Sequence, residues 1–371
     1  GLSRPASEVF AGTVEKLAAL PPNPIRRRSI WCRMLGKAML PLAGVAERSA
    51  RRHGKRNRAS SRRESRSERV LFIVGSPEYL RYFDTTIADL AKHGLHVSIG
   101  VNSQRDEKLA RLESLDSHAG LVSSVGMVPE YGGVWGPIAT GLRGLHDFIR
   151  YLDPRLAQAS ALRQRIKRKA LPILFWPLDW IPSLSAKSVT RLRRLLTGFE
   201  AAIPPSQAVC QFLREIQPGI VLVSPLVDAA SPQVDTVKAA RALGLPVGLC
   251  VASWDNLSNK GCLRETPDRI FVWNERQRQE AIDLHSIRPE RIEVTGAQLF
   301  DRWFDRSPIR SQSEFSELVG LSSDRPFLLF TGSSIFISRS SGEVEVVRRW
   351  VEAIRHSGMP EIEDIPILVR P

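Results

Sequence analysis

The sequence has few cysteines and lacks the long apolar runs that mark many membrane and secreted proteins. Its four cysteines, Cys32, Cys210, Cys250 and Cys262, show no Cys-x-x-Cys spacing. A zinc site needs about four suitably spaced ligands, so we expect no metal centre and interpret these residues as reduced thiols. No apolar run reaches the roughly 20 residues of a membrane-spanning helix, and no signal peptide is evident. Reduced thiols and the lack of such segments indicate a cytoplasmic protein.

Positive charge is abundant, but it is concentrated at one end of the chain. The formal net charge is +14, yet residues 1–69 carry 17 Lys/Arg against 5 Asp/Glu, while residues 70–371 carry 36 against 34. The folded part is therefore nearly neutral, which does not favour a nucleic-acid-binding domain. We predict that residues 1–69 form a disordered basic leader, since residues 51–69 are rich in Arg and Ser.

Two functions of this leader remain open. It is either an arm for an anionic membrane or RNA, or a solvated tail that includes sequence upstream of a true start at Met34 or Met39. We favour the second.

Apolar runs and helical patterns alternate along the rest of the chain. A strand at 70–75, a helix ending at Lys92 and a strand at 96–101 form a βαβ unit. The alternation returns with strands at 219–224, 246–252, 269–274 and 291–295, and with helices at 206–216, 232–243 and 275–284. A last group comprises strands 327–330 and 366–370 with a helix at 342–356. This order predicts an α/β protein with one or two doubly wound parallel sheets.

Residues 115–200 interrupt the alternation, and we predict a helical insertion there. A basic helix runs through Arg163, Arg165, Lys167, Arg168 and Lys169, and is followed by a Trp-rich apolar stretch at 171–181. A basic segment beside Trp-rich residues is typical of a membrane interface, so peripheral membrane contact through 163–181 is one interpretation. The alternative is that the stretch packs on the sheet, because its two prolines argue against a continuous amphipathic helix.

Polar residues follow several predicted strands, at the sheet edge where such folds bind ligands. After the first strand, Gly75-Ser76-Pro77-Glu78 lacks the GxGxxG spacing of a dinucleotide site, but Glu78 and Asp84 are candidates for a general base or an acceptor contact. Asp228 follows the strand at 219–224. The alternatives are structural, with Glu78 as a first-turn charge and Asp228 as a turn or capping residue.

The densest group lies between 251 and 261. Asp255 is suited to take a proton from a hydroxyl, Trp254 to stack on a sugar or base, and Asn256 and Lys260 to bind polar or anionic groups. The alternative is an Asx-type loop in which Trp254 anchors the core and Lys260 is solvated.

A second candidate loop, Thr331-Gly332-Ser333-Ser334, precedes a helix. It offers hydroxyls and backbone N–H groups, which hold phosphates without a Walker lysine.

Several of these segments resemble bacterial glycosyltransferase-like proteins of the GT-B fold. The resemblance is carried by Trp254 to Leu257, Lys260-Gly261, Pro267-Asp268, Val272 to Asn274, Val294 to Gly296 and Phe300-Asp301, and also by Val70 to Asp84 and Arg370-Pro371. UDP-N-acetylglucosamine 2-epimerases and CDP-glycerol glycerophosphotransferases are related in fold. The epimerases have a His-x-Glu-Ala-Gly pattern where Trp254-Asp255-Asn256 stands here.

The resemblance implies two Rossmann-like domains: an acceptor-side domain at 70–308 and a donor-side domain beginning at 309. It implies that Asp255 or Glu78 deprotonates the acceptor. Acceptor contacts would come from Ser76, Asp84, Asp228, Trp254, Asn256 and Lys260. Donor-phosphate contacts would come from Gly296, Thr331, Gly332, Ser333, Ser334 and Arg370. No Asp-x-Asp motif occurs, so no metal is expected, and no cofactor beyond the nucleotide-sugar donor.

The expected function is transfer of a sugar from a nucleotide-linked donor to a glycan or lipid-linked acceptor in cell-surface glycan synthesis. Nucleic acid is not an expected partner. The chain starts at Gly1 and stops on a strand, so we expect a truncated donor-side domain at 309–371 and little or no activity. An epimerase-like or glycerophosphotransferase-like enzyme and a non-enzymatic binder that uses the basic arm are the alternatives.

Overall fold

The computed structural model describes most of the chain. The described residues are 4–20, 29, 31–32, 34–35, 68–103, 120–181, 183–304, 306–322, 325–333 and 340–370. Two compact units divide at residue 304, one comprising Gly1–Phe304 and the other Asp305–Pro371. Most of the Arg/Ser-rich segment at 51–69 lies outside the described residues, so the prediction of disorder there is untested.

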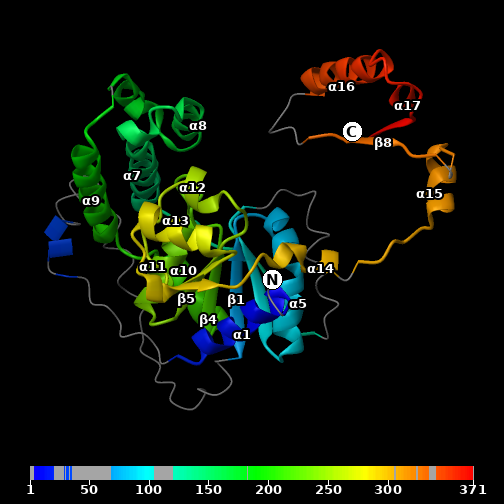
Figure 1. Ribbon diagram of the computed structural model, residues 1–371. Coiled ribbons are helices and arrows are strands. Elements are labelled where there is room, and N and C mark those ends of the chain that lie inside the picture. The colour runs from blue at the N-terminus through cyan, green and yellow to red at the C-terminus, as the bar shows by residue number, and fades with distance from the viewer. Residues whose placement is uncertain are drawn as a thin grey trace. The chain divides into compact units, whose positions relative to one another are not determined.

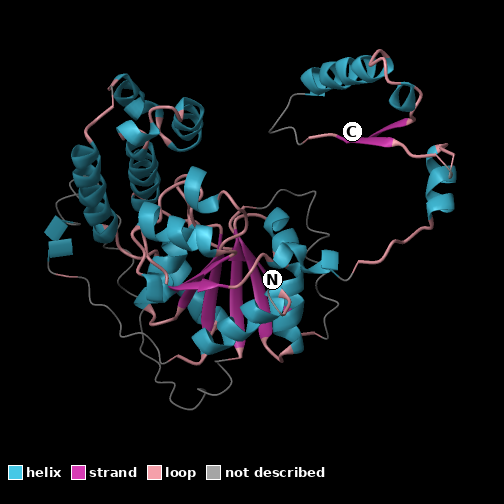
Figure 2. Cartoon of the chain, in the orientation of Figure 1, coloured by secondary structure: helices cyan, strands magenta, loops and turns pink. Residues whose placement is uncertain are grey.

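The first unit is built on a seven-stranded, fully parallel sheet with the order β3-β2-β1-β4-β5-β6-β7. Figure 2 shows the sheet in magenta with helices around it. Its strands are β1 (Arg69–Val74), β2 (His96–Val101), β3 (Val122–Met127), β4 (Ile220–Ser224), β5 (Val247–Cys250), β6 (Arg269–Val272) and β7 (Ile292–Val294). The predicted α/β class is confirmed. The order grows outward in both directions from the β1–β4 pair, as in Rossmann-like sheets.

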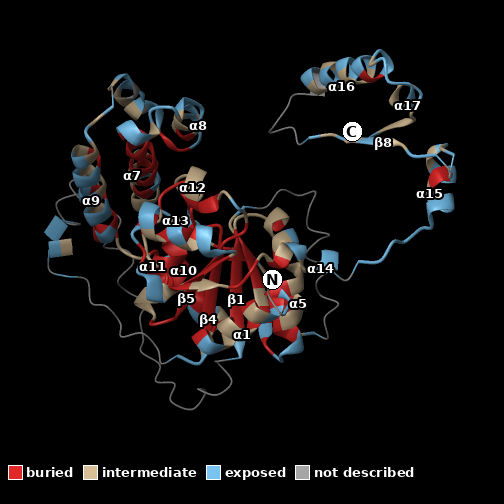
Figure 3. Cartoon of the chain, viewed as in Figure 1, coloured by how far each residue is buried: buried red, intermediate tan, exposed pale blue. Residues whose placement is uncertain are grey.

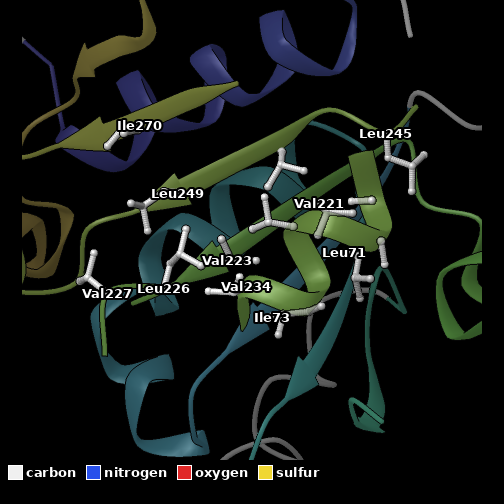
Figure 4. Close-up of a cluster of buried hydrophobic side chains, with 14 of the residues drawn as sticks. Leu71, Ile73, Val221, Val223, Leu226, Val227, Val234, Leu245, Leu249 and Ile270 are labelled. Carbon is white, nitrogen blue, oxygen red and sulfur yellow. The ribbon is translucent and has the colours of Figure 1, made fainter. Parts of the chain in front are cut away.

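Both faces of this sheet are buried, as a parallel sheet requires. Successive residues of β1 alternate between the two cores: Phe72 lies in one, while Leu71 and Ile73 lie in the other. Helices α1 (Ala6–Ala18) and α5 (Asp84–Lys92) cover the first face, and α10 (Gln207–Ile216), α11 (Gln233–Ala242) and α13 (Glu275–His285) cover the second. Figure 4 shows the second core, where side chains of the central strands meet those of α11.

Helix α1 corrects the prediction that all of residues 1–69 form a disordered leader. Phe10, Val14 and Leu17 are buried, and the Phe10 ring lies 4.7 Å from the Phe271 ring of β6. The carboxylate of Asp301 accepts hydrogen bonds from the first N–H groups of the helix, at Ala6 (3.0 Å) and Ser7 (2.6 Å). Residues 6–18 are therefore part of the folded unit.

The helical insertion is shorter than the predicted 115–200 at its start, because residues 122–127 form the edge strand β3. The insertion itself comprises α7 (Trp135–Arg150), η3 (Pro154–Leu156), α8 (Ser160–Ala170), η4 (Ile173–Trp180) and α9 (Ala186–Ala202). These elements share a core of their own, to which Phe148 and Ile166 belong (Figures 1 and 3). Ala229 and Ala230, which follow β4, pack against this core and join the insertion to the sheet.

A buried ion network also ties the insertion to the sheet. The Arg143 guanidinium of α7 donates to Glu200 of α9 at 2.9 and 3.2 Å, and to Asp235 of α11 at 2.7 and 2.8 Å. Lys238 of α11 donates to the Glu200 carboxylate at 3.1 Å. Burial alone would raise the pKa of Glu200, but Arg143 and Lys238 outweigh it and lower that pKa to about 2. Two cations and two anions thus balance within the interior.

Shorter elements of the first unit connect these layers. They are η1 (Pro77–Tyr82), α12 (Asn256–Asn259), η5 (Pro289–Arg291), η6 (Gln298–Phe300) and α14 (Asp301–Phe304).

The second unit contains a two-stranded parallel sheet of β8 (Leu328–Thr331) and β9 (Ile367–Arg370). Helix α16 (Ser340–Arg355) lies between the strands in the sequence, so the predicted order of strand, helix and strand in this region is confirmed. The Phe330 ring lies 5.6 Å from the Trp350 ring. Helices α15 (Gln312–Val319) and α17 (Pro360–Glu363) complete the unit. In the described parts of both units, no helix has the length and apolar character needed to cross a bilayer.

Candidate functional site

The site lies where strand order changes direction, beyond the carboxyl ends of β1 and β4. Open α/β sheets bind ligands in the crevice at this point. The two exit loops approach closely: the Gly75 N–H donates to the Ser224 carbonyl at 2.8 Å. A Cβ at Gly75 would lie 3.3 Å from the Pro225 ring, so glycine allows the approach.

Polar side chains from η1 and the loop after β4 meet at this edge of the sheet. The Tyr79 hydroxyl of η1 donates to Asp228 Oδ2 at 3.4 Å. Burial and then the Asp228 charge raise the pKa of Tyr79. Tyr79 therefore remains a protonated donor to the Asp228 carboxylate. Asp255 lies on the loop after β5, the strand next to β4 in the sheet. The sequence predicted Asp228 and Asp255 but missed Tyr79, although its place one residue after Glu78 was a usable signal.

The loop after β5 holds Asp255 through local hydrogen bonds. Ser253 Oγ donates to Asp255 Oδ1 at 2.7 Å. Asn256 Oδ1 accepts from the N–H groups of Ala252 (2.9 Å) and Ser253 (3.2 Å), and the residue is buried. The predicted Asn256 contact with a ligand would therefore have to compete with bonds that shape the loop. Trp254 is 72% exposed, so it is available for stacking and is not a core anchor.

Cations from the insertion hold the end of α12. Arg150 of α7 donates to the carbonyls of Ser258 (2.7 Å) and Lys260 (3.3 Å), and Arg165 of α8 donates to that of Asn259 (3.3 Å). Positive groups at a helix C-terminus complement its exposed carbonyls. The backbone of Lys260 is thus fixed, and its predicted role in binding stays a prediction.

Asp147 of α7 clamps two site loops together. Its carboxylate accepts from the Ala230 N–H at 2.9 Å and the Cys262 N–H at 2.7 Å, and pairs with the Arg264 guanidinium. At Gly261 a Cβ would lie 2.9 Å from Asp147 Oδ1 and 2.9 Å from the Val227 carbonyl, so only glycine fits. The loops that carry Asp228 and Lys260 therefore meet on one buried carboxylate, which the sequence reasoning missed.

The remaining candidates of the first unit lie in or beside η1, at the start of α5 and after β7. Ser76 precedes η1, and its carbonyl accepts from the Tyr79 N–H at 3.0 Å. Glu78 lies in the first turn of η1 and is partly buried. Asp84 begins α5 and pairs with Arg302 at 3.4 Å. Gly296 follows β7 with a φ of 91°, a backbone conformation that favours glycine.

The predicted phosphate loop in the second unit is already hydrogen-bonded to a carboxylate of α16. Both the N–H and the hydroxyl of Ser333 donate to Glu343 Oε1 of α16, at 2.6 and 2.7 Å. These bonds lower the pKa of Glu343. Thr331 and Arg370 are register partners, and the Gly332 N–H donates to the Arg370 carbonyl at 2.7 Å. Ser334 lies outside the described residues. A phosphate would have to displace Glu343 to use Ser333.

In the described segments, no three His, Cys, Asp or Glu side chains are placed to hold a metal ion. Cys210, Cys250 and Cys262 are buried free thiols, and burial raises the pKa of each.

His285 is a buried neutral link between α12 and the following loop. Its Nδ1 accepts from the Leu263 N–H at 3.1 Å, which places the ring proton on Nε2, 2.8 Å from the Leu257 carbonyl. Burial, followed by the nearby Arg150, lowers the pKa of His285 to about 3. Burial and Arg264 likewise lower the pKa of His146 to about 3.

Both histidines are neutral in the folded state, whereas in the unfolded chain they protonate near pH ~6.5. We therefore expect the free energy of unfolding to decrease as the pH is lowered. The stability that the two neutral histidines contribute is fully present above pH ~6.5. It is lost progressively as the pH falls toward their folded pKa of about 3. At pH 5.5 each histidine should cost about 1.4 kcal/mol of unfolding free energy. Urea unfolding at pH 7.5 and 5.5 measures the difference, and His285→Gln should remove about half of it. The exposed His96→Gln is the control, and equal pH dependence in both variants would contradict this assignment.

No protein-family model matches this chain, and the search of curated proteins finds no significant relative. The function is therefore argued from the site.

Proposed function

We propose that the protein is a glycosyltransferase-like enzyme of the GT-B type. It would transfer a sugar from a nucleotide-linked donor to an acceptor hydroxyl in cell-surface glycan synthesis. The observation that carries the proposal is the placement of Asp228 and Asp255 on the exit loops of the neighbouring strands β4 and β5, with the Tyr79 hydroxyl bonded to Asp228. The exposed ring of Trp254, which precedes Asp255 in the same loop, offers an apolar face to a sugar.

In the proposed reaction Asp255 accepts the proton of the acceptor hydroxyl as its oxygen bonds to the anomeric carbon of the donor sugar. The bond from that carbon to the nucleotide diphosphate breaks, and the diphosphate leaves with the electron pair. Ser253 orients the Asp255 carboxylate through its 2.7 Å bond. Tyr79 and Asp228 supply a donor and an acceptor for other hydroxyls of the acceptor. Thr331, Gly332, Ser333 and Arg370 remain the proposed contacts to donor phosphates.

Asp255→Asn tests the proton transfer. The amide oxygen can still accept from Ser253, so the loop should keep its geometry while the base is lost. In a full-length version of the protein, we expect turnover to fall about 10²-fold or more, with donor affinity unchanged. Release of nucleoside diphosphate from UDP-, GDP- and CDP-linked sugars gives turnover, and calorimetry gives donor affinity.

The matched control is Asp283→Asn on the exposed surface of α13, which should retain full turnover. Turnover of Asp255→Asn within about threefold of the parent chain would remove Asp255 from the role of base.

A second candidate function has one observation in its favour. An epimerase needs an acid and a base on a sugar carbon, and Asp228 and Asp255 are two carboxylates on the exit loops of neighbouring strands. The two functions separate on one measurement: an epimerase incorporates solvent deuterium at a sugar carbon without an acceptor, and a transferase does not.

A further inference from the structure

The helical insertion carries an unusual concentration of positive charge. Residues 155–194 contain ten Lys/Arg and one Asp. Arg168 and Lys169 at the end of α8 are exposed, as are Lys187, Arg191 and Arg194 of α9. Charge of this density on one short region is an electrostatic footprint for an anionic surface.

The same region exposes large apolar side chains. Phe175 and Leu178 of η4 pack against the core of the insertion, which fixes the segment in place. Ile173 is 75% exposed and Trp180 is 89% exposed, and Trp176 is 39% exposed. Exposed apolar groups of this size on an ordered element mark an interaction surface.

Apolar and basic groups are interleaved in this surface. Lys167 Nζ of α8 lies 4.9 Å from the centre of the Trp176 ring, and Trp176 Nε1 donates to the Leu171 carbonyl at 3.2 Å. Amphipathic aromatic rings beside lysines suit the boundary between lipid head groups and acyl chains. The aliphatic Ile173 has no ring to stack on a base, which favours a bilayer over a single-stranded nucleic acid as the occupant.

We propose that α8, η4 and the start of α9 form a docking surface for an anionic lipid bilayer. Trp180 and Ile173 enter the head-group region, while the exposed cations of α8 and α9 contact lipid phosphates. The inference stands apart from the proposed transfer chemistry, because it uses no residue of the candidate site. Arg165 of the same basic helix contacts the Asn259 carbonyl, so docking would hold the candidate loop close to the bilayer.

Binding of the full chain to vesicles of 70% phosphatidylcholine and 30% phosphatidylglycerol tests the proposal. Both side chains of the Ile173→Ser/Trp180→Ser variant are exposed, so it should fold normally, which circular dichroism verifies. We expect its partition coefficient to fall roughly tenfold or more, because the apolar area that enters the bilayer is lost. The control Phe304→Ser removes an equally exposed ring, 86% exposed at the end of α14, and should change binding less than twofold.

The Arg-rich segment at 51–69 is also strongly basic and would be attracted to anionic vesicles by its charge. A second measurement therefore separates its contribution from that of the proposed docking surface. Brominated acyl chains should quench part of the tryptophan emission of the parent chain, and Trp180→Phe should remove that part. Arg62→Gln/Arg63→Gln lowers the charge of the segment and should leave the quenching of bound protein unchanged, whereas Arg168→Gln/Lys169→Gln should reduce binding. Vesicle binding that is unchanged in Ile173→Ser/Trp180→Ser would overturn the proposal. So would a variant that still binds vesicles but no longer binds a single-stranded oligonucleotide, because the surface would then bind nucleic acid.

Discussion

Arg143→Met is expected to lower the free energy of unfolding of the first unit by about 3–5 kcal/mol. Arg143 is 2% exposed and neutralises Glu200 and Asp235 at the same time. Methionine fills a similar volume but leaves Asp235 without its cation in the interior, and Lys238 reaches only Glu200. An uncompensated buried charge costs far more than the pair itself contributes, so the loss is a large share of the stability of a domain.

Urea unfolding followed by tryptophan emission measures this loss. Arg276→Met is the matched control, because Arg276 pairs with Glu280 at the surface with its side chain 83% exposed and should matter by less than about 0.5 kcal/mol. The double variant Arg143→Met/Asp235→Asn removes the orphaned charge and should recover part of the loss. A single variant no less stable than the control would contradict a central role for this network.

The sequence predicted the sheet well because its central strands are buried on both faces. Such strands are continuous apolar runs bounded by Gly, Pro or charged residues, and the strand at 96–101 has the predicted bounds. The edge strand β3 was missed because its sequence, VSSVGM, is mostly polar or exposed and has no such run. Helix α1 was missed among the prolines and charges near it, although Phe10, Val14 and Leu17 have helical spacing.

The candidate site was predictable only where its residues follow strands. Asp228 and Asp255 follow β4 and β5, so the geometry of parallel sheets placed them at one edge. Arg143 and Asp147 lie within α7, and their partners are far away in the sequence at Glu200 and Arg264. Tertiary packing alone creates these pairs. Two opposite charges four residues apart in one helix suggest that they pair with each other at the surface. In the fold, both are buried and each pairs with a residue far away in the sequence.

The second large effect concerns Asp147, which has no exposed side-chain surface. Asp147→Asn should cost about 3–5 kcal/mol of unfolding free energy. An amide has one acceptor oxygen, so either the Ala230 or the Cys262 N–H would face an NH₂ group. Arg264 would lose its carboxylate, and its Nε and Nη1 already have no hydrogen-bond partner among the described residues.

Hydrogen exchange distinguishes local opening of the two loops from a general loss of stability of the first unit. In Asp147→Asn the amides of Ala230 and Cys262 should lose protection well beyond the change at β1, because the two loops open locally before the sheet unfolds. The double variant Asp147→Asn/Arg264→Met removes the unpaired cation and should regain stability, but it leaves the loops less protected than in the parent chain. Uniform loss of protection across the first unit would show that Asp147 contributes only to the overall stability of the fold and does not position the two loops. A loss confined to the two loops would show that the insertion sets the positions of Asp228 and Lys260.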